Sequence, residues 1–118
     1  MNIPLLSFGC ALLVFLHVLI WFSSNGQFME GNEFFKKHSF LFAICASPIV
    51  AALGYYGSRF IHEAMTQSVW QIRFIGFGLS YLVFPVLTWH FLGESMFTLK
   101  TMLCISLSIL IIFIQIYM

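Results

Sequence analysis

The sequence predicts an all-α polytopic membrane protein with four transmembrane helices and no soluble domain. Of its 118 residues, 61% are hydrophobic and 8% are charged, against about 45–50% apolar and about 25% charged residues in an ordinary soluble domain. The apolar residues gather in long runs, and about 20 such residues cross a bilayer as a helix. Because the connections between the runs are short, residues 1–118 are expected to form a single transmembrane domain.

The charges are too few to cover a water-facing surface. Five Lys or Arg and four Asp or Glu give a net charge of +1, which does not supply the basic stripe that a nucleic-acid-binding module needs. We therefore expect an integral membrane protein, in the cell (inner) membrane, whose surroundings are the lipid bilayer and which has no nucleic-acid partner.

The first two spans are expected over residues 3–23 and 39–57. The first contains no Asp, Glu, Lys or Arg, and its bulky end at Trp21 favours a retained helix over a cleaved signal peptide. The polar segment 24–38 separates the two spans and opens with the turn sequence Asn25-Gly26. A continuation of the second span toward Glu63 as an interfacial helix is an open alternative.

The third and fourth spans are expected over residues 69–92 and 97–117, separated by the turn Gly93-Glu94-Ser95. Four antiparallel crossings place both termini on one side of the membrane. Lys36, Lys37 and Lys100 lie on one side and Arg59 and Arg73 on the other, so the positive-inside rule weakly favours termini outside and the first and third loops in the cytoplasm. A division this even also allows insertion both ways.

A stripe of small residues runs along one face of the second span. Small residues let helix backbones approach closely in membranes, so we interpret the stripe as a helix-packing surface, with a dimer seam or a substrate wall as alternatives. Its members recur every three or four residues: Ala43, Ser47, Ala51, Gly54 and Ser58.

Arg73 is the first candidate for a substrate contact. It lies about one turn inside the third span, where a charge must reach the headgroups, pair, or face a wet cavity. Helical spacing puts Trp70, Phe77 and Tyr81 on its face. We expect the guanidinium to meet an anionic group while the aromatic rings contact an apolar portion of the substrate. Snorkelling of Arg73 to lipid headgroups is the alternative.

His17 is the ionisable residue deep in the first span, and we include it in the substrate-binding set because imidazole exchanges protons near neutral pH. The alternative is a neutral imidazole bonded to a neighbouring backbone. His62-Glu63 begins a zinc-protease pattern, but Thr66 stands where the second zinc-binding histidine is needed. We therefore expect no enzyme, no metal site and no cofactor.

The C-terminal half resembles a known transporter group. The stretch Thr88-Trp89-His90-Phe91-Leu92-Gly93-Glu94, followed by a very apolar last helix, is similar to the end of the drug/metabolite transporter superfamily. Its four-helix branch, the small multidrug resistance family, has a similar ending, and Ser68-Val69-Trp70 resembles the opening of that family's third helix. The resemblance implies a small transporter that works as a dimer.

One departure changes the expected substrate. Members of that family are expected to carry a membrane-embedded Glu in the first helix, whereas residues 8–21 contain His17 and no carboxylate. We therefore expect a homodimeric transporter or flippase for an anionic, lipid-linked or polar small substrate, and not a drug–proton antiporter. The alternative is a non-catalytic structural or accessory subunit of a larger membrane complex.

Overall fold

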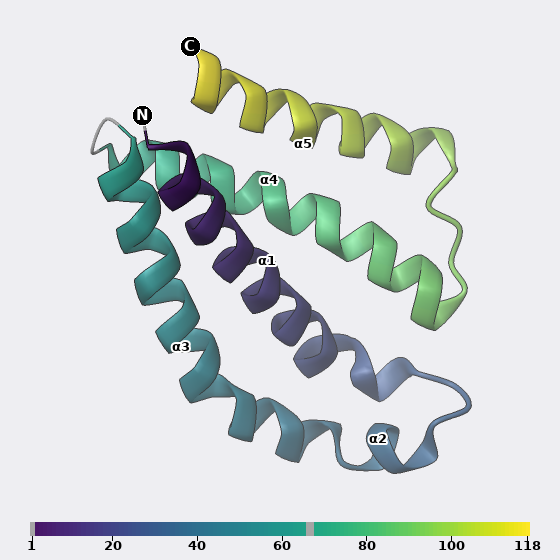
Figure 1. Cartoon of the computed structure of the whole chain (residues 1–118). Coiled ribbons are helices and arrows are strands. Elements are labelled where there is room, and N and C mark those ends of the chain that lie inside the picture. Colours follow the sequence, from purple (N-terminus) through teal and green to yellow (C-terminus); the bar gives the residue numbers. More distant parts are fainter. Residues whose placement is uncertain (1, 66–67) are drawn as a thin grey trace.

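The computed structural model describes residues 2–65 and 68–118, and these residues form helices and connecting turns (Figure 1). Four of the helices are long and apolar enough to cross a membrane, which confirms the all-α prediction with four helices of spanning length. The elements are α1 (Ile3–Asn25), a short helix α2 (Glu33–Lys37), α3 (Ser39–Ala64), α4 (Val69–Leu87) and α5 (Leu99–Tyr117).

Local sequence explains how α1 begins. The Asn2 side chain accepts a hydrogen bond from the Leu5 amide at 3.1 Å, and Pro4 occupies the first turn, where its missing N–H costs nothing. The Asn2 amide donates to the Ala64 carbonyl at 2.9 Å. This bond ties the start of α1 to the end of α3.

The second and third long helices end differently from what their apolar runs indicate. α3 continues without interruption to Ala64, beyond residue 57, and Arg59 and Glu63 form an ion pair of 3.2 Å on this extension. The third span continues beyond Leu87 as one π-helical turn, Thr88–Leu92, before the left-handed Gly93. The helix therefore covers the predicted range 69–92, but its last turn is wider than an α-helix.

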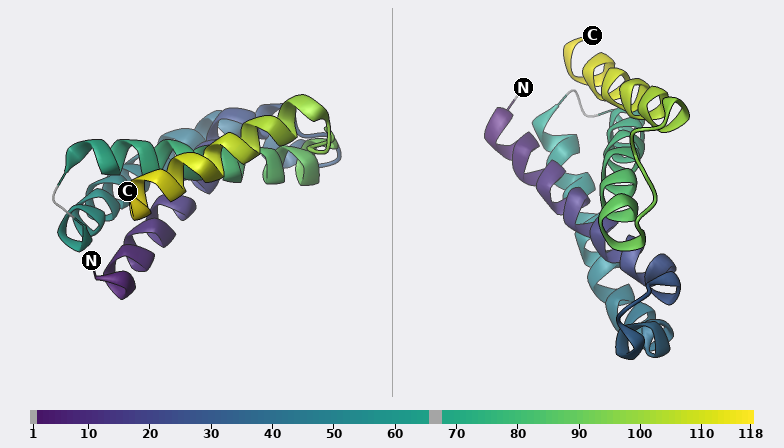
Figure 2. Two further views of the ribbon diagram at one scale, coloured as in Figure 1. Left: turned by 90° about the horizontal axis from the view of Figure 1, so that it is seen from above. Right: turned by 90° about the vertical axis from the view of Figure 1, so that its right-hand side faces the viewer.

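The long helices form an open row and not a closed ring. α1 packs between α3 and α4, and α5 packs on α4 (Figure 1). Both termini lie at the end where α3 stops and α4 starts, and from there α3 and α4 diverge. The two other views show the resulting flattened shape, whose extents are 45 × 36 × 20 Å (Figure 2).

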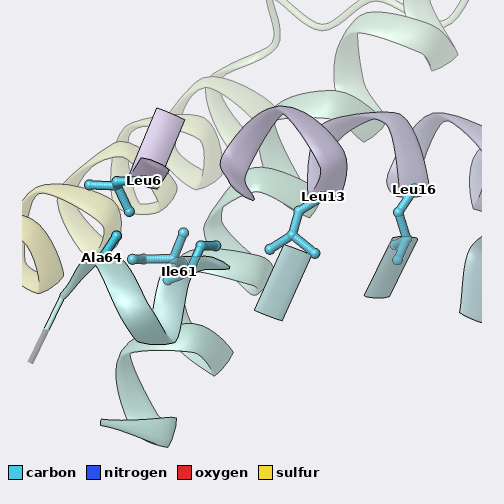
Figure 3. Packing of buried hydrophobic residues seen from close by; sticks show 6 residues of the cluster. Leu6, Leu13, Leu16, Ile61 and Ala64 are labelled. Carbon is cyan, nitrogen blue, oxygen red and sulfur yellow. The ribbon is translucent and has the colours of Figure 1, made fainter. Parts of the chain in front are cut away.

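The seam between α1 and α3 is the most closely packed part of the row. Leu6 and Leu13 of α1 lie next to Ile61 and Ala64 of α3, and Leu16 lies further along the same seam (Figure 3). The three leucines stand at positions i, i+7 and i+10, which lie on one helix face. In lipid, where hydrophobicity does not drive helices together, van der Waals contact of this kind supplies much of the attraction.

Glycines mark the two places where helix backbones cross. A Cβ atom on Gly9 would lie 3.1 Å from the carbonyl oxygen of Gly57 in α3. A Cβ atom on Gly78 of α4 would lie 3.2 Å from the carbonyl oxygen of Ser108 and 2.6 Å from Ile112 Cγ1, both in α5. Glycine therefore sets the helix spacing at both crossings.

A buried hydrogen bond fastens the far end of α1 to α4. The indole Nε1–H of Trp21 donates to Thr88 Oγ1 at 3.0 Å, and both side chains are buried. Phe91 packs against Trp21 and Phe22, with ring centroids 5.7 and 5.1 Å apart. The π-helical turn that contains Thr88 and Phe91 is thus held in place by the end of α1.

Candidate functional site

A groove of about 410 Å³ opens where α1, α3 and α4 meet. We name it the Arg73 groove, and its volume lies within the range of about 300–1,000 Å³ that is usual for small-molecule sites. Its walls combine apolar side chains, small residues and two nitrogen-bearing side chains. The residues that matter for its chemistry are His17 from α1, Gly54 and Ser58 from α3, and Arg73, Gly76 and Phe77 from α4.

Arg73 supplies the positive charge of the groove. Its Cζ atom lies 5.2 Å from the centroid of the Phe77 ring, a distance at which the ring face attracts a guanidinium. In the part of the chain that the structure describes, the ion pairs join other residues, and Arg73 has no carboxylate partner. Because a guanidinium offers a planar fork of N–H donors, it is suited to bind a carboxylate or phosphate.

His17 lies between the Arg73 groove and a smaller hollow of about 100 Å³. The half-buried imidazole approaches the backbone of Gly76 across the contact between α1 and α4. The smaller hollow is lined in part by Ser24, Asn25 and Ser80. The two hollows along α1 and α4 therefore share the His17 side chain as part of their lining.

Some residues of the aromatic face predicted for α4 line the Arg73 groove, and others are exposed outside it. Arg73 and Phe77 line the groove, whereas Trp70 and Tyr81 are 72% and 58% exposed and do not. Trp70 instead stacks on Phe74, with ring centroids 5.9 Å apart. Gly76 faces Leu13 of α1, and at 3.6 residues per turn Trp70 and Tyr81 lie about a third of a turn or more around the helix from it.

The small-residue stripe lies beside the α1 seam and lines hollows. Gly54 and Ser58 line the Arg73 groove, while the rest of the stripe lines a further hollow against Ile20, Ser23 and Ser24 of α1: Ala43, Ser47 and Ala51. The buried residues of α3 follow a neighbouring line: Ser39, Ala46, Gly57, Ile61 and Ala64. The small side chains leave space on this face of α3.

A second hollow adjoins the Arg73 groove and shares Gly54, Ser58 and Ile72 with it. It has a volume of about 360 Å³ and brings Arg59 and His62 to the same region. The sequence reasoning did not select these two residues. Their position near the end of α3, opposite the first turns of α4, could have identified them as candidates for the site.

The described residues offer no metal site, because no three His, Cys, Asp or Glu side chains among them gather closely enough to hold an ion. Comparison with protein-family models, with curated proteins and with solved structures finds no match for the chain. The resemblance to the drug/metabolite transporter superfamily therefore stays a prediction, and the function is argued from the groove.

Proposed function

We propose that the chain is an integral membrane transporter or flippase that binds an anionic or lipid-linked small substrate in the Arg73 groove. The observation that carries this proposal is an arginine in a groove between spanning-length helices, without a carboxylate partner among the described residues. A charge within a spanning helix is costly unless it reaches the headgroups, pairs, or faces a wet cavity. An anionic substrate would supply that partner.

The lining of the groove supports this substrate class. Arg73 repels cations and can bind an anionic group through two N–H donors at once. His17 adds a side chain that can donate a hydrogen bond to the same substrate. Leu13, Leu16 and Phe77 supply apolar surface for a lipid-linked portion.

The open row of helices supports a dimer. Apart from Ser108, the residues of α5 are at least partly exposed. Four helices arranged in this way do not enclose a path through the membrane. A second copy would complete the walls, and alternating access would follow from rocking of the two copies around the groove.

Copurification of small molecules tests the proposal. The wild type and the Arg73→Leu variant are purified in a mild detergent, and bound molecules are identified by mass spectrometry. Lys100→Leu, which removes a cation from the exposed start of α5, is the matched control. We expect an anionic molecule with the wild type and the Lys100 variant, and its loss from the Arg73 variant.

The same preparation distinguishes the alternative function. A dimer with an Arg73-dependent anion supports the transporter. Equal amounts of every bound anion in all three preparations, or obligate copurification with a larger membrane protein, would favour an accessory subunit instead.

A further inference from the structure

Arg59 and Arg73 face one region from two neighbouring antiparallel helices. Arg59 lies five residues before the end of α3 at Ala64, and Arg73 lies four residues after the start of α4 at Val69. At 1.5 Å per residue, the two positions are about 6–8 Å from the helix ends. The two residues therefore lie at similar distances along their helices from the connection between α3 and α4.

The hollows that these arginines line adjoin each other. The Arg73 groove and the Arg59 hollow share Gly54, Ser58 and Ile72 as common walls. Of these, Gly54 and Ser58 from α3 are small, and Ile72 from α4 is the larger apolar side chain of the shared wall. The Ser58 hydroxyl adds a hydrogen-bonding group at the boundary.

The region keeps a net positive charge. Glu63 lies 3.2 Å from Arg59 Nε and neutralises one of the two cations, while Arg73 is unpaired within the described residues. The contact with Glu63 uses the Nε edge of Arg59, and Tyr55 on the same helix also hydrogen-bonds this side chain. A guanidinium has five N–H donors, so others remain that can donate to a ligand. His62 lines the same hollow.

We infer that Arg59 and Arg73 together bind one phosphate group of an amphiphile, with the phosphate at the boundary of the two hollows. This inference rests on the proposed function and names the substrate class of its groove. A phosphate has enough oxygens to accept hydrogen bonds from two guanidinium groups. The apolar portion extends from the boundary into the deeper groove, against Leu13, Leu16 and Phe77.

Binding of hexadecyl phosphate tests this inference. Bound molecules are counted by native mass spectrometry from a non-ionic detergent for the wild type, Arg59→Gln, Arg73→Gln and Lys100→Gln. We expect each of the two groove variants to weaken binding about tenfold or more, because each loses a charge-assisted hydrogen bond. The Lys100 variant should bind as the wild type does, and circular dichroism verifies that all variants are folded.

A further variant separates a direct role of Arg59 from an indirect one. Arg59→Gln leaves Glu63 without its partner, and that negative charge alone could repel phosphate. The double variant Arg59→Gln/Glu63→Gln removes both charges. If Arg59 contacts the phosphate, the double variant stays weak; recovery of wild-type affinity would show that Arg59 merely neutralises Glu63 and would overturn the inference.

The remaining outcomes distinguish this inference from the proposed function. Full binding by Arg59→Gln with loss in Arg73→Gln would refute the shared phosphate site and leave the Arg73 groove standing. Full binding by both variants would refute the shared site and the proposed function. Inorganic phosphate that competes as strongly as hexadecyl phosphate would show a site for free phosphate and would refute the amphiphile.

Discussion

Replacing Gly9 by alanine introduces a methyl group where α1 crosses α3. The new Cβ would lie 2.8 Å from Ile61 Cγ1, 3.1 Å from the Gly57 carbonyl oxygen and 3.2 Å from the Ile61 amide nitrogen. Two of these three atoms belong to the backbone of α3, so a change of side-chain rotamer cannot relieve the contact. We expect the two helices to separate slightly and to lose contact along the seam.

The magnitude follows from two opposing effects. Overpacking of a well-packed interior costs about 1–3 kcal/mol, whereas alanine is favoured over glycine within a helix by about 1 kcal/mol. The net loss of stability for Gly9→Ala is therefore about 0–2 kcal/mol. At Gly76 the nearest atom to a new Cβ is Leu13 Cδ1, at an ordinary 3.9 Å, so Gly76→Ala should gain up to about 1 kcal/mol.

The assay is unfolding of both variants by sodium dodecyl sulfate in mixed micelles, followed by circular dichroism. The difference between Gly9→Ala and Gly76→Ala should equal the overpacking cost, about 1–3 kcal/mol, because the helix-propensity gain is common to both. Equal midpoints for the two variants would refute the close crossing of α1 and α3.

Three further predictions concern other contacts. Trp21→Phe and Thr88→Val each remove one partner of the 3.0 Å hydrogen bond, and a double-mutant cycle of unfolding free energies should give a coupling of about 0.5–1.5 kcal/mol; strict additivity would contradict the bond. Gly78→Leu should loosen α5 from α4, because even a Cβ there would lie 2.6 Å from an α5 side chain; hydrogen exchange of α5 amides in micelles should rise, and unchanged exchange would count against the contact. Cysteines replacing Lys36 and Lys100 should show the same side preference when labelled in membranes, and opposite preferences would contradict the topology.

The helices could be predicted from sequence because long apolar runs are sufficient evidence for them. Their ends were harder to place. α3 continues past residue 57, where charged and polar side chains lower the hydropathy, because the i, i+4 pair of Arg59 and Glu63 suits a helix. Hydropathy identifies the apolar run, but the helix extends beyond the end of that run.

The arrangement of the helices could not be read from the sequence. Lipid-facing and protein-facing residues are both apolar in a membrane helix, so the pattern does not reveal which face meets a neighbour. The stripe that contains Ser47 and Ala51 was interpreted as a packing surface, yet these two side chains are exposed and Gly57 and Ile61 fill the seam. Which face of a helix is packed depends on the neighbouring helix, and the residue pattern of one helix carries no information about its neighbour.

Two residues of the candidate site could be predicted from the sequence, but the shape of the groove could not. His17 and Arg73 stood out because ionisable groups are rare within apolar runs, and the structure places both on one groove. Arg59 was overlooked because it lies at the edge of its span, where a charge needs no explanation. Its position beside the groove depends on the packing of α3 next to α4.

The central claim is that an electropositive, water-accessible groove lies beside Arg73. Ser58→Cys, in a background whose native cysteines are replaced by alanine, places a thiol in the groove wall, and Ser106→Cys places one on the exposed face of α5. In membranes, a negatively charged methanethiosulfonate should modify the Ser58 position faster than a positively charged one, and Arg73→Gln should abolish this preference, while the Ser106 position stays unreactive. No reaction at position 58, or equal rates for both reagents, would contradict the account.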